Sequence, residues 1–121
     1  MKKRILRECL QIARSNVCKH DQPFIHFSFV IHNNKIVEWG KNMSGNPPKY
    51  FGYPKWSKIH SEISAVKKAK GLIKGEPFSM VNIRTNRRGS LRNSKPCPSC
   101  QRFLKELKCL KITFSYEGGF K

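Results

Sequence analysis

Two short motifs in this chain carry side chains that suit zinc. The motif KPCPSC contains Cys97 and Cys100, and the motif HSE contains His60 and Glu62. Two thiolates and one imidazole are ligands that catalytic zinc sites use, with a fourth position kept for water. Glu62 follows the histidine by two residues, where a carboxylate can take up and return the protons of that water. The sequence therefore predicts a hydrolytic zinc site whose ligands are His60, Cys97 and Cys100, with Glu62 as general acid and base.

Each motif has a simpler interpretation when it is taken alone. A single C-x-x-C motif also fits a dithiol redox site or half of a structural zinc knuckle, and a single H-x-E motif is weak. The two motifs occur in this order, and Pro96 precedes the first cysteine. This combination favours a catalytic zinc site over a purely structural one.

The hydrophobic periodicity predicts the elements that must hold these motifs. Residues 3–18 have the pattern of an amphipathic helix, and residues 24–31 and 36–40 have that of two strands joined by a turn at Asn33 and Asn34. The remaining expected elements are a long loop over 41–58, a helix over 59–70 stopped by Gly71, a strand over 78–85, a polar connection over 86–95, a helix over 97–108 and a strand over 110–116. His60 and the two cysteines then lie in the first turns of two helices, whose positive ends favour thiolates.

The order of these elements indicates the fold class. The order α-β-β-α-β-α-β begins with a hairpin and then alternates helix with strand, which is typical of an α/β domain with a mixed sheet and helices on its faces. With 121 residues, we expect a single compact domain over 1–121. The sheet should have four strands, or five.

Taken together, the H-x-E and P-C-x-x-C motifs resemble those of the zinc-dependent cytidine deaminase superfamily. The resemblance implies a cytidine-deaminase-like three-layer α-β-α fold and Zn²⁺ as cofactor. It also implies His60, Cys97 and Cys100 as the zinc ligands and Glu62 as the proton shuttle.

Other segments match the family less closely. Gly40-x-Asn42 looks like the family segment whose asparagine contacts the sugar, although Asn42 also fits a turn residue. Ser61 stands where most members have Ala or Val. The chain also ends soon after the expected fourth strand, so the fifth strand and last helix of larger relatives are expected to be absent.

The charge of the chain points to a polyanionic partner. There are 25 Lys and Arg residues against 7 Asp and Glu residues, giving a net charge of +18. Such a surplus in a small domain favours nucleic acid. A membrane surface is the weaker alternative, because no anchor segment accompanies the charge.

The basic and aromatic residues near the motifs bear on the class of substrate. Aromatic residues alternate with lysines in the loop before His60, as in a track on which unpaired bases stack. Alternatively, Phe51 and Trp56 pack under this loop as a small satellite core. The expected substrate contacts are Asn42, Ser61, Ser94, Tyr50, Tyr53, Trp56, Arg87, Arg88 and Lys95.

We therefore predict a deaminase that converts cytosine to uracil in single-stranded DNA or RNA. The alternatives are a free cytidine or deoxycytidine nucleotide deaminase, then a tRNA adenosine deaminase, and then a non-catalytic zinc-stabilised module that binds nucleic acid. The sequence does not indicate a protein partner.

The cysteines and the N-terminus bear on the compartment. Five cysteines without disulfide-framework spacing suit a reducing compartment, with Cys9, Cys18 and Cys109 as core thiols. Arg7 and Glu8 interrupt the N-terminal apolar residues, so we expect no signal peptide, and no segment has the length of a transmembrane span. We expect a cytoplasmic protein.

Overall fold

The computed structural model describes residues 2–16, 24–41, 61–86, 88–96 and 98–121. The chain forms three helices and six strands within these ranges. In chain order they are α1 (Lys3–Ser15), β1 (Phe24–His32), β2 (Lys35–Lys41), α2 (Ser61–Ile73), β3 (Phe78–Asn86), β4 (Leu91–Arg92), α3 (Pro98–Glu106), β5 (Cys109–Tyr116) and β6 (Gly119–Phe120).

The strands form one mixed sheet with the order β2-β1-β3-β5-β6, and β4 pairs with β3. β1 pairs antiparallel with β2 and β3, whereas β3 and β5 are parallel. The turn between β1 and β2 has positive φ at both Asn33 (52°) and Asn34 (61°), which is the geometry of a tight hairpin. Helices α2 and α3 directly precede the two parallel strands, β3 and β5, so the two helices run in the same direction.

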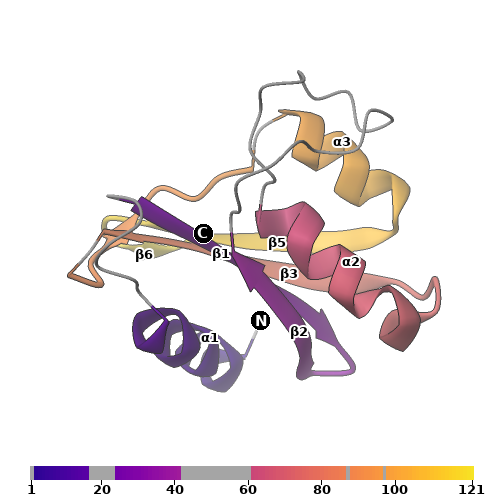
Figure 1. Ribbon diagram of the computed structural model, residues 1–121, viewed down its shortest axis with the longest axis horizontal. Helices are drawn as coiled ribbons and strands as arrows, with labels where there is room; N and C mark the ends of the chain where they lie inside the picture. Colours follow the sequence, from indigo (N-terminus) through magenta and orange to yellow (C-terminus); the bar gives the residue numbers. More distant parts are fainter. Residues whose placement is uncertain (1, 17–23, 42–60, 87, 97) are drawn as a thin grey trace.

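The helices cover the two faces of the sheet, as Figure 1 shows, with α1 on one face and α2 and α3 side by side on the other. Alternation along β1 assigns its side chains to these faces. Phe27, Phe29 and Ile31 belong to the core cluster under α1, whereas Val30 belongs to the cluster under α2 and α3. The molecule therefore has three layers. None of the helices in the described ranges is long and apolar enough to cross a membrane.

The predicted fold class is confirmed, with differences at the ends of elements. Helix α2 does not stop at Gly71 but continues to Ile73, because Gly71 has helical geometry and the left-handed residues that end the helix are Lys74 (φ 49°) and Gly75 (φ 78°). Two strands of two residues each, β4 and β6, were not predicted. They are too short to show a hydrophobic alternation, and they form because their neighbours offer a free edge.

Cys9 of α1 is fully buried against the sheet, as predicted for a core thiol. Burial raises the pKa of this thiol from its ordinary 9.0 to about 12, so the folded protein keeps the proton that the unfolded chain loses above about pH 9. The free energy of unfolding should therefore fall as the pH rises from about 9 toward 12, with Cys9 contributing about 1.4 kcal/mol of the fall by pH 10.

Urea denaturation at about pH 8 and about pH 10 measures this effect. The Cys9→Ala variant should lose about 1.4 kcal/mol less than the unaltered protein between the two pH values. Burial also raises the pKa of the Cys109 thiol, to about 11. Cys109 is present in both proteins, so its contribution to the pH dependence cancels in the comparison. Equal losses in the two proteins would show that Cys9 ionises as readily folded as unfolded.

Candidate active site

The first turns of α2 and α3 lie next to each other on one face of the sheet. Val66 and Phe103 pack in the same core cluster and line the same groove between the helices. Each follows the first residue of its helix by five positions, and the helices run in the same direction in Figure 1. The two helices therefore lie side by side, with the ends that carry positive partial charge at the same end of this layer.

Two of the predicted functional side chains occupy these first turns. Glu62 is the second residue of α2 and is 5% exposed, and Cys100 is the third residue of α3 and is fully buried. Helix ends of this kind stabilise a carboxylate and a thiolate through the helix dipole and the free backbone amides. Glu62 and Cys100 are therefore both buried at helix N-termini on the same face of the sheet, and their joint role in a site stays a prediction.

The burial of Glu62 is unusual because little in the described part of the chain compensates for it. Its one hydrogen-bond partner there is the Ser61 hydroxyl, 2.9 Å from Oε1, and it makes no ion pair with a described residue. Buried carboxylates are ordinarily paired with cations, hydrogen-bonded several times or placed at metal sites. A buried acid with a single donor is a candidate for a functional group rather than a structural one.

A chain of polar side chains connects Glu62 to the middle of the sheet. The Ser28 hydroxyl of β1 lies 2.7 Å from the Ser61 hydroxyl and 2.8 Å from Oδ1 of Asn82 in β3. Ser28 and Asn82 face each other in the antiparallel register of the two strands. Each hydroxyl has one proton to donate, so the two serines donate in the same direction at any one time, either both toward Asn82 or both toward Glu62. When they donate toward Glu62, these hydroxyls hold its carboxylate from the side of the sheet.

A second set of contacts fixes the segment that leads into α3. The buried Ser94 hydroxyl donates to the Asn82 carbonyl (2.9 Å) and accepts from the Ser115 amide of β5 (2.7 Å). The Gln101 side chain of α3 then donates to the Pro96 carbonyl (2.8 Å). Asn82 thus contacts both the serine chain under Glu62 and the segment before α3, so the two halves of the candidate site share one residue of β3.

The structure tests the position of some predicted site residues and leaves others undescribed. Outside the described residues lie His60, Cys97, Asn42, Tyr50, Tyr53, Trp56 and Arg87. Ser61 and Ser94 are buried, with their hydroxyls engaged as above, and Lys95 is exposed just before α3. Arg88 lies in the turn between β3 and β4, where Gly89 accepts a hydrogen bond from Arg14 of α1, and so it is beside α1 rather than beside α2 and α3. As substrate contacts, these residues remain predictions.

Sequence reasoning missed Ser28 and Asn82. Both are fully or almost fully buried polar residues that stand between apolar neighbours in their strands, FIHFSFVIH and FSMVNIRTN. Such an interruption of a buried strand is a signal that could have identified them, because buried polar groups are retained where they find a partner.

The residues present fit a zinc ion. Cys100 supplies a buried sulfur at a helix N-terminus, and Glu62 supplies a buried carboxylate without a described cation. Imidazole and thiolate are the donors that zinc prefers, and His60 and Cys97 directly precede the described first turns in the sequence. Within the described residues alone, no group of three His, Cys, Asp or Glu side chains is placed to hold a metal.

The chain resembles known proteins in its fold. No protein-family model matches the chain, and no curated protein matches its sequence. Solved structures do match, over almost all of the chain. Cytidine deaminase from Burkholderia pseudomallei is similar with a TM-score of 0.64 and 18% identity, covering 100% of this chain and 91% of that one.

Two further structures agree with this result. Cytidine deaminase from Mycobacterium leprae has a TM-score of 0.60 and 14% identity, covering 98% of this chain and 89% of the other. The dCMP deaminase from the cyanophage S-TIM5 has a TM-score of 0.57 and 18% identity, covering 94% and 84%. The chain therefore has the α/β fold of the cytidine deaminases.

Proposed function

We propose that this protein is a zinc-dependent hydrolytic deaminase that converts cytosine to uracil in single-stranded DNA or RNA. The observation that carries the proposal is the buried Glu62 carboxylate, held in the first turn of α2 beside the first turn of α3 with its buried Cys100. The same two turns follow or contain the H-x-E and P-C-x-x-C motifs, and they occur in a cytidine deaminase fold.

His60, Cys97 and Cys100 would hold the zinc ion, which supplies, when bound, a nucleophile derived from water at neutral pH. Glu62 accepts one proton of the attacking water and passes it to N3 of the cytosine, and it then transfers the second proton, from the new C4 hydroxyl, to the departing amino group. A C4–O bond forms and the C4–N4 bond breaks, so cytosine and water yield uracil and ammonia. Ser61 and Ser28 keep the carboxylate in one orientation during both transfers.

The charge supports a polymeric substrate over a free nucleotide. A mononucleotide needs one or two cations for its phosphate, whereas the chain has a net charge of +18. Polynucleotide binding uses many lysines and arginines along the backbone of the nucleic acid. We therefore place single-stranded nucleic acid first.

A free nucleoside or nucleotide is the second candidate. It is favoured by the similar solved structures, which include deaminases of cytidine and of dCMP. In this case the basic surface would serve a separate contact, and the target would enter the site without flanking residues.

A comparison of substrates decides between these functions. The zinc-loaded protein is incubated with a cytosine-containing single-stranded oligonucleotide, cytidine, deoxycytidine and their monophosphates, and uracil products are measured by mass spectrometry. We expect faster conversion in the oligonucleotide, by on the order of tenfold or more in kcat/KM, since each flanking base that stacks on an aromatic ring adds about 1–3 kcal/mol. Turnover of the small molecules alone would overturn the polymer assignment. Conversion of adenine in tRNA, or no conversion of any base, would instead favour an adenosine deaminase or a zinc-stabilised binding module.

A further inference from the structure

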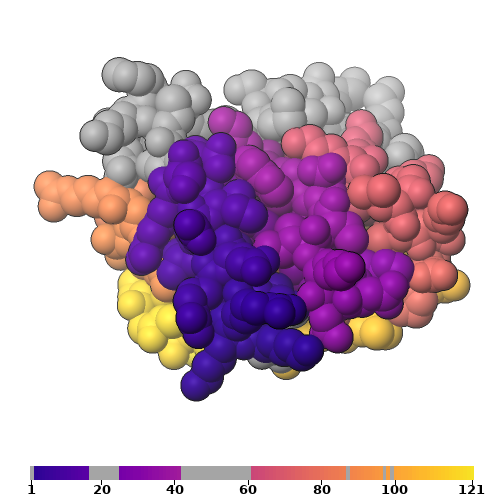
Figure 2. Space-filling model, turned by 90° about the horizontal axis from the view of Figure 1, so that it is seen from below, coloured from indigo at the N-terminus to yellow at the C-terminus, as the bar shows by residue number. Residues whose placement is uncertain are grey.

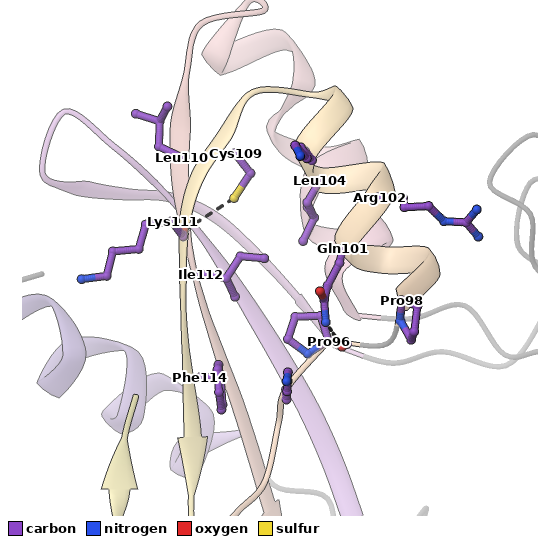
Figure 3. A pocket seen from close by; sticks show the side chains of 12 residues that line it. Pro96, Pro98, Gln101, Arg102, Leu104, Cys109, Leu110, Lys111, Ile112 and Phe114 are labelled. Carbon is purple, nitrogen blue, oxygen red and sulfur yellow. Dashed lines mark hydrogen bonds between the residues drawn. The ribbon is translucent and has the colours of Figure 1, made fainter.

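A groove runs between α3 and β5, outside the buried candidate site. Its volume is about 630 Å³, and its lining has an apolar part that includes Leu104, Ile112 and Phe114. Figure 3 shows these three side chains in the space between the helix and the strand. Pro96 and Pro98 line it as well, so one end adjoins the first turn of α3.

The groove has a strongly positive rim. Among the twelve described residues that line it are four exposed cations and no carboxylate; the cations are Lys95, Arg102, Lys105 and Lys111. In Figure 3, Arg102 and Lys111 extend outward on opposite sides of the groove. Within the described ranges, none of the four makes an ion pair. An apolar floor between unpaired cations suits a ligand with flat apolar rings and regularly spaced negative charges, which is the chemistry of a single nucleic-acid strand.

A peptide that adds a strand to the outer edge of β5 fits this region less well than a nucleic-acid strand in the groove. β6 pairs with Ser115 and Tyr116, and the Lys121 amide donates to the Phe114 carbonyl at 2.9 Å, so one end of the edge is occupied. Farther along, the edge carries Lys111, and a lysine on an edge strand disfavours pairing with another chain. The cations favour nucleic acid over an added strand.

We infer that the α3–β5 groove binds the nucleotides that flank the target cytosine in a single-stranded substrate. The inference rests on the proposed function for the identity of the target. Lys95 and Pro96 immediately precede Cys97 in the sequence, so a strand leaving the candidate site along α3 enters the groove directly. Lys95, Arg102, Lys105 and Lys111 then neutralise phosphates, and the partly exposed Phe114 offers a ring to a base.

The test compares two variants that lose the same charge. Arg102→Gln/Lys105→Gln changes the groove, and Lys3→Gln/Arg7→Gln changes exposed cations of α1, on the opposite face of the sheet, which Figure 2 shows from the side of α1. Binding of a fluorescent single-stranded oligonucleotide of about 15 nucleotides is measured by anisotropy between about 50 and 200 mM salt. Deamination of free cytidine is measured in parallel.

Each phosphate contact contributes about −0.7 to the slope of log K against log salt for a single strand. The groove variant should therefore have a slope less negative by about 1.4 and an affinity lower by roughly tenfold per removed contact at about 50 mM salt, with unchanged cytidine turnover. The α1 variant should retain the slope of the unaltered protein. Equal slopes in the two variants would overturn the inference and leave the groove open to an acidic protein partner. A changed slope without deamination of any base would retain the strand-binding groove and refute the proposed function.

Discussion

Replacing Glu62 with Gln should reduce deamination by roughly 10²- to 10⁴-fold, which is the usual contribution of a positioned general acid and base. The substitution preserves the size of the side chain and an oxygen that can accept from the Ser61 hydroxyl, now 2.9 Å from Oε1. It removes the group that accepts and returns the proton. Because Glu62 is not a predicted zinc ligand, the metal content and the unfolding temperature should stay close to those of the unaltered protein. Single-turnover kinetics measures the deamination rate, zinc analysis the metal content, and thermal denaturation the unfolding temperature.

Ser61→Ala is the matched control, because it keeps the carboxylate and removes the donor that orients it. We expect a smaller loss than for Glu62→Gln, with partial recovery in Ser61→Thr, which retains a hydroxyl. Normal turnover in the zinc-loaded Glu62→Gln variant would exclude the carboxylate as the proton shuttle.

Replacing Gly40 with Ala should destabilise the protein through a direct steric conflict. Gly40 lies near the end of β2, where the strand passes close to the first turns of α2. An added Cβ would lie 2.7 Å from the Ala65 backbone nitrogen and 2.6 Å from the Ser64 hydroxyl oxygen. Since a backbone atom cannot move aside as a side chain can, β2 and α2 must separate. The free energy of unfolding should fall by about 1–3 kcal/mol, as for other overpacked positions.

Gly71→Ala provides the control for this substitution. Gly71 lies within α2, and a Cβ there would meet nothing within 4 Å. Alanine in an open helical position should raise stability by about 0.5–1 kcal/mol. Urea denaturation of the two variants should therefore show opposite signs. A Gly40→Ala protein as stable as the unaltered one would mean that β2 and α2 are not in the close contact described here.

Much of the fold could be predicted because local pattern and tertiary structure agree. The apolar spacing of α1 predicted a helix with Cys9 inward, and the paired asparagines 33 and 34 predicted the hairpin turn. The predicted end of α2 at Gly71 was wrong, because a glycine only weakens a helix. The packing of Ile73 in the core cluster outweighs that weakening. β4 and β6 could not be predicted, since their pairing depends on which edges the rest of the sheet leaves available.

The motifs of the candidate site could be recognised in the sequence, but the residues that hydrogen-bond to them from other elements could not. Glu62 and Cys100 were predicted from their two motifs, and the structure shows each of them buried in the first turn of its helix, while their roles stay predictions. The contact of Ser28 with Ser61 depends on a strand passing beneath a helix that begins 33 positions later, which no local pattern encodes. Cys109 fits the predicted core thiol only in part: it packs against the core cluster under α2 and α3, but it is half-buried and also lines the α3–β5 groove.

X-ray absorption at the zinc edge tests the central claim most directly, because it reports the number and kind of atoms around the metal in the purified protein. The account predicts one zinc ion per chain with two sulfur ligands at about 2.3 Å and lighter ligands at about 2.0–2.1 Å, one of them the His60 nitrogen and one a water oxygen. Loss of one sulfur in Cys100→Ala would assign that ligand. Absence of zinc, or a site with four sulfurs and no nitrogen, would contradict the account.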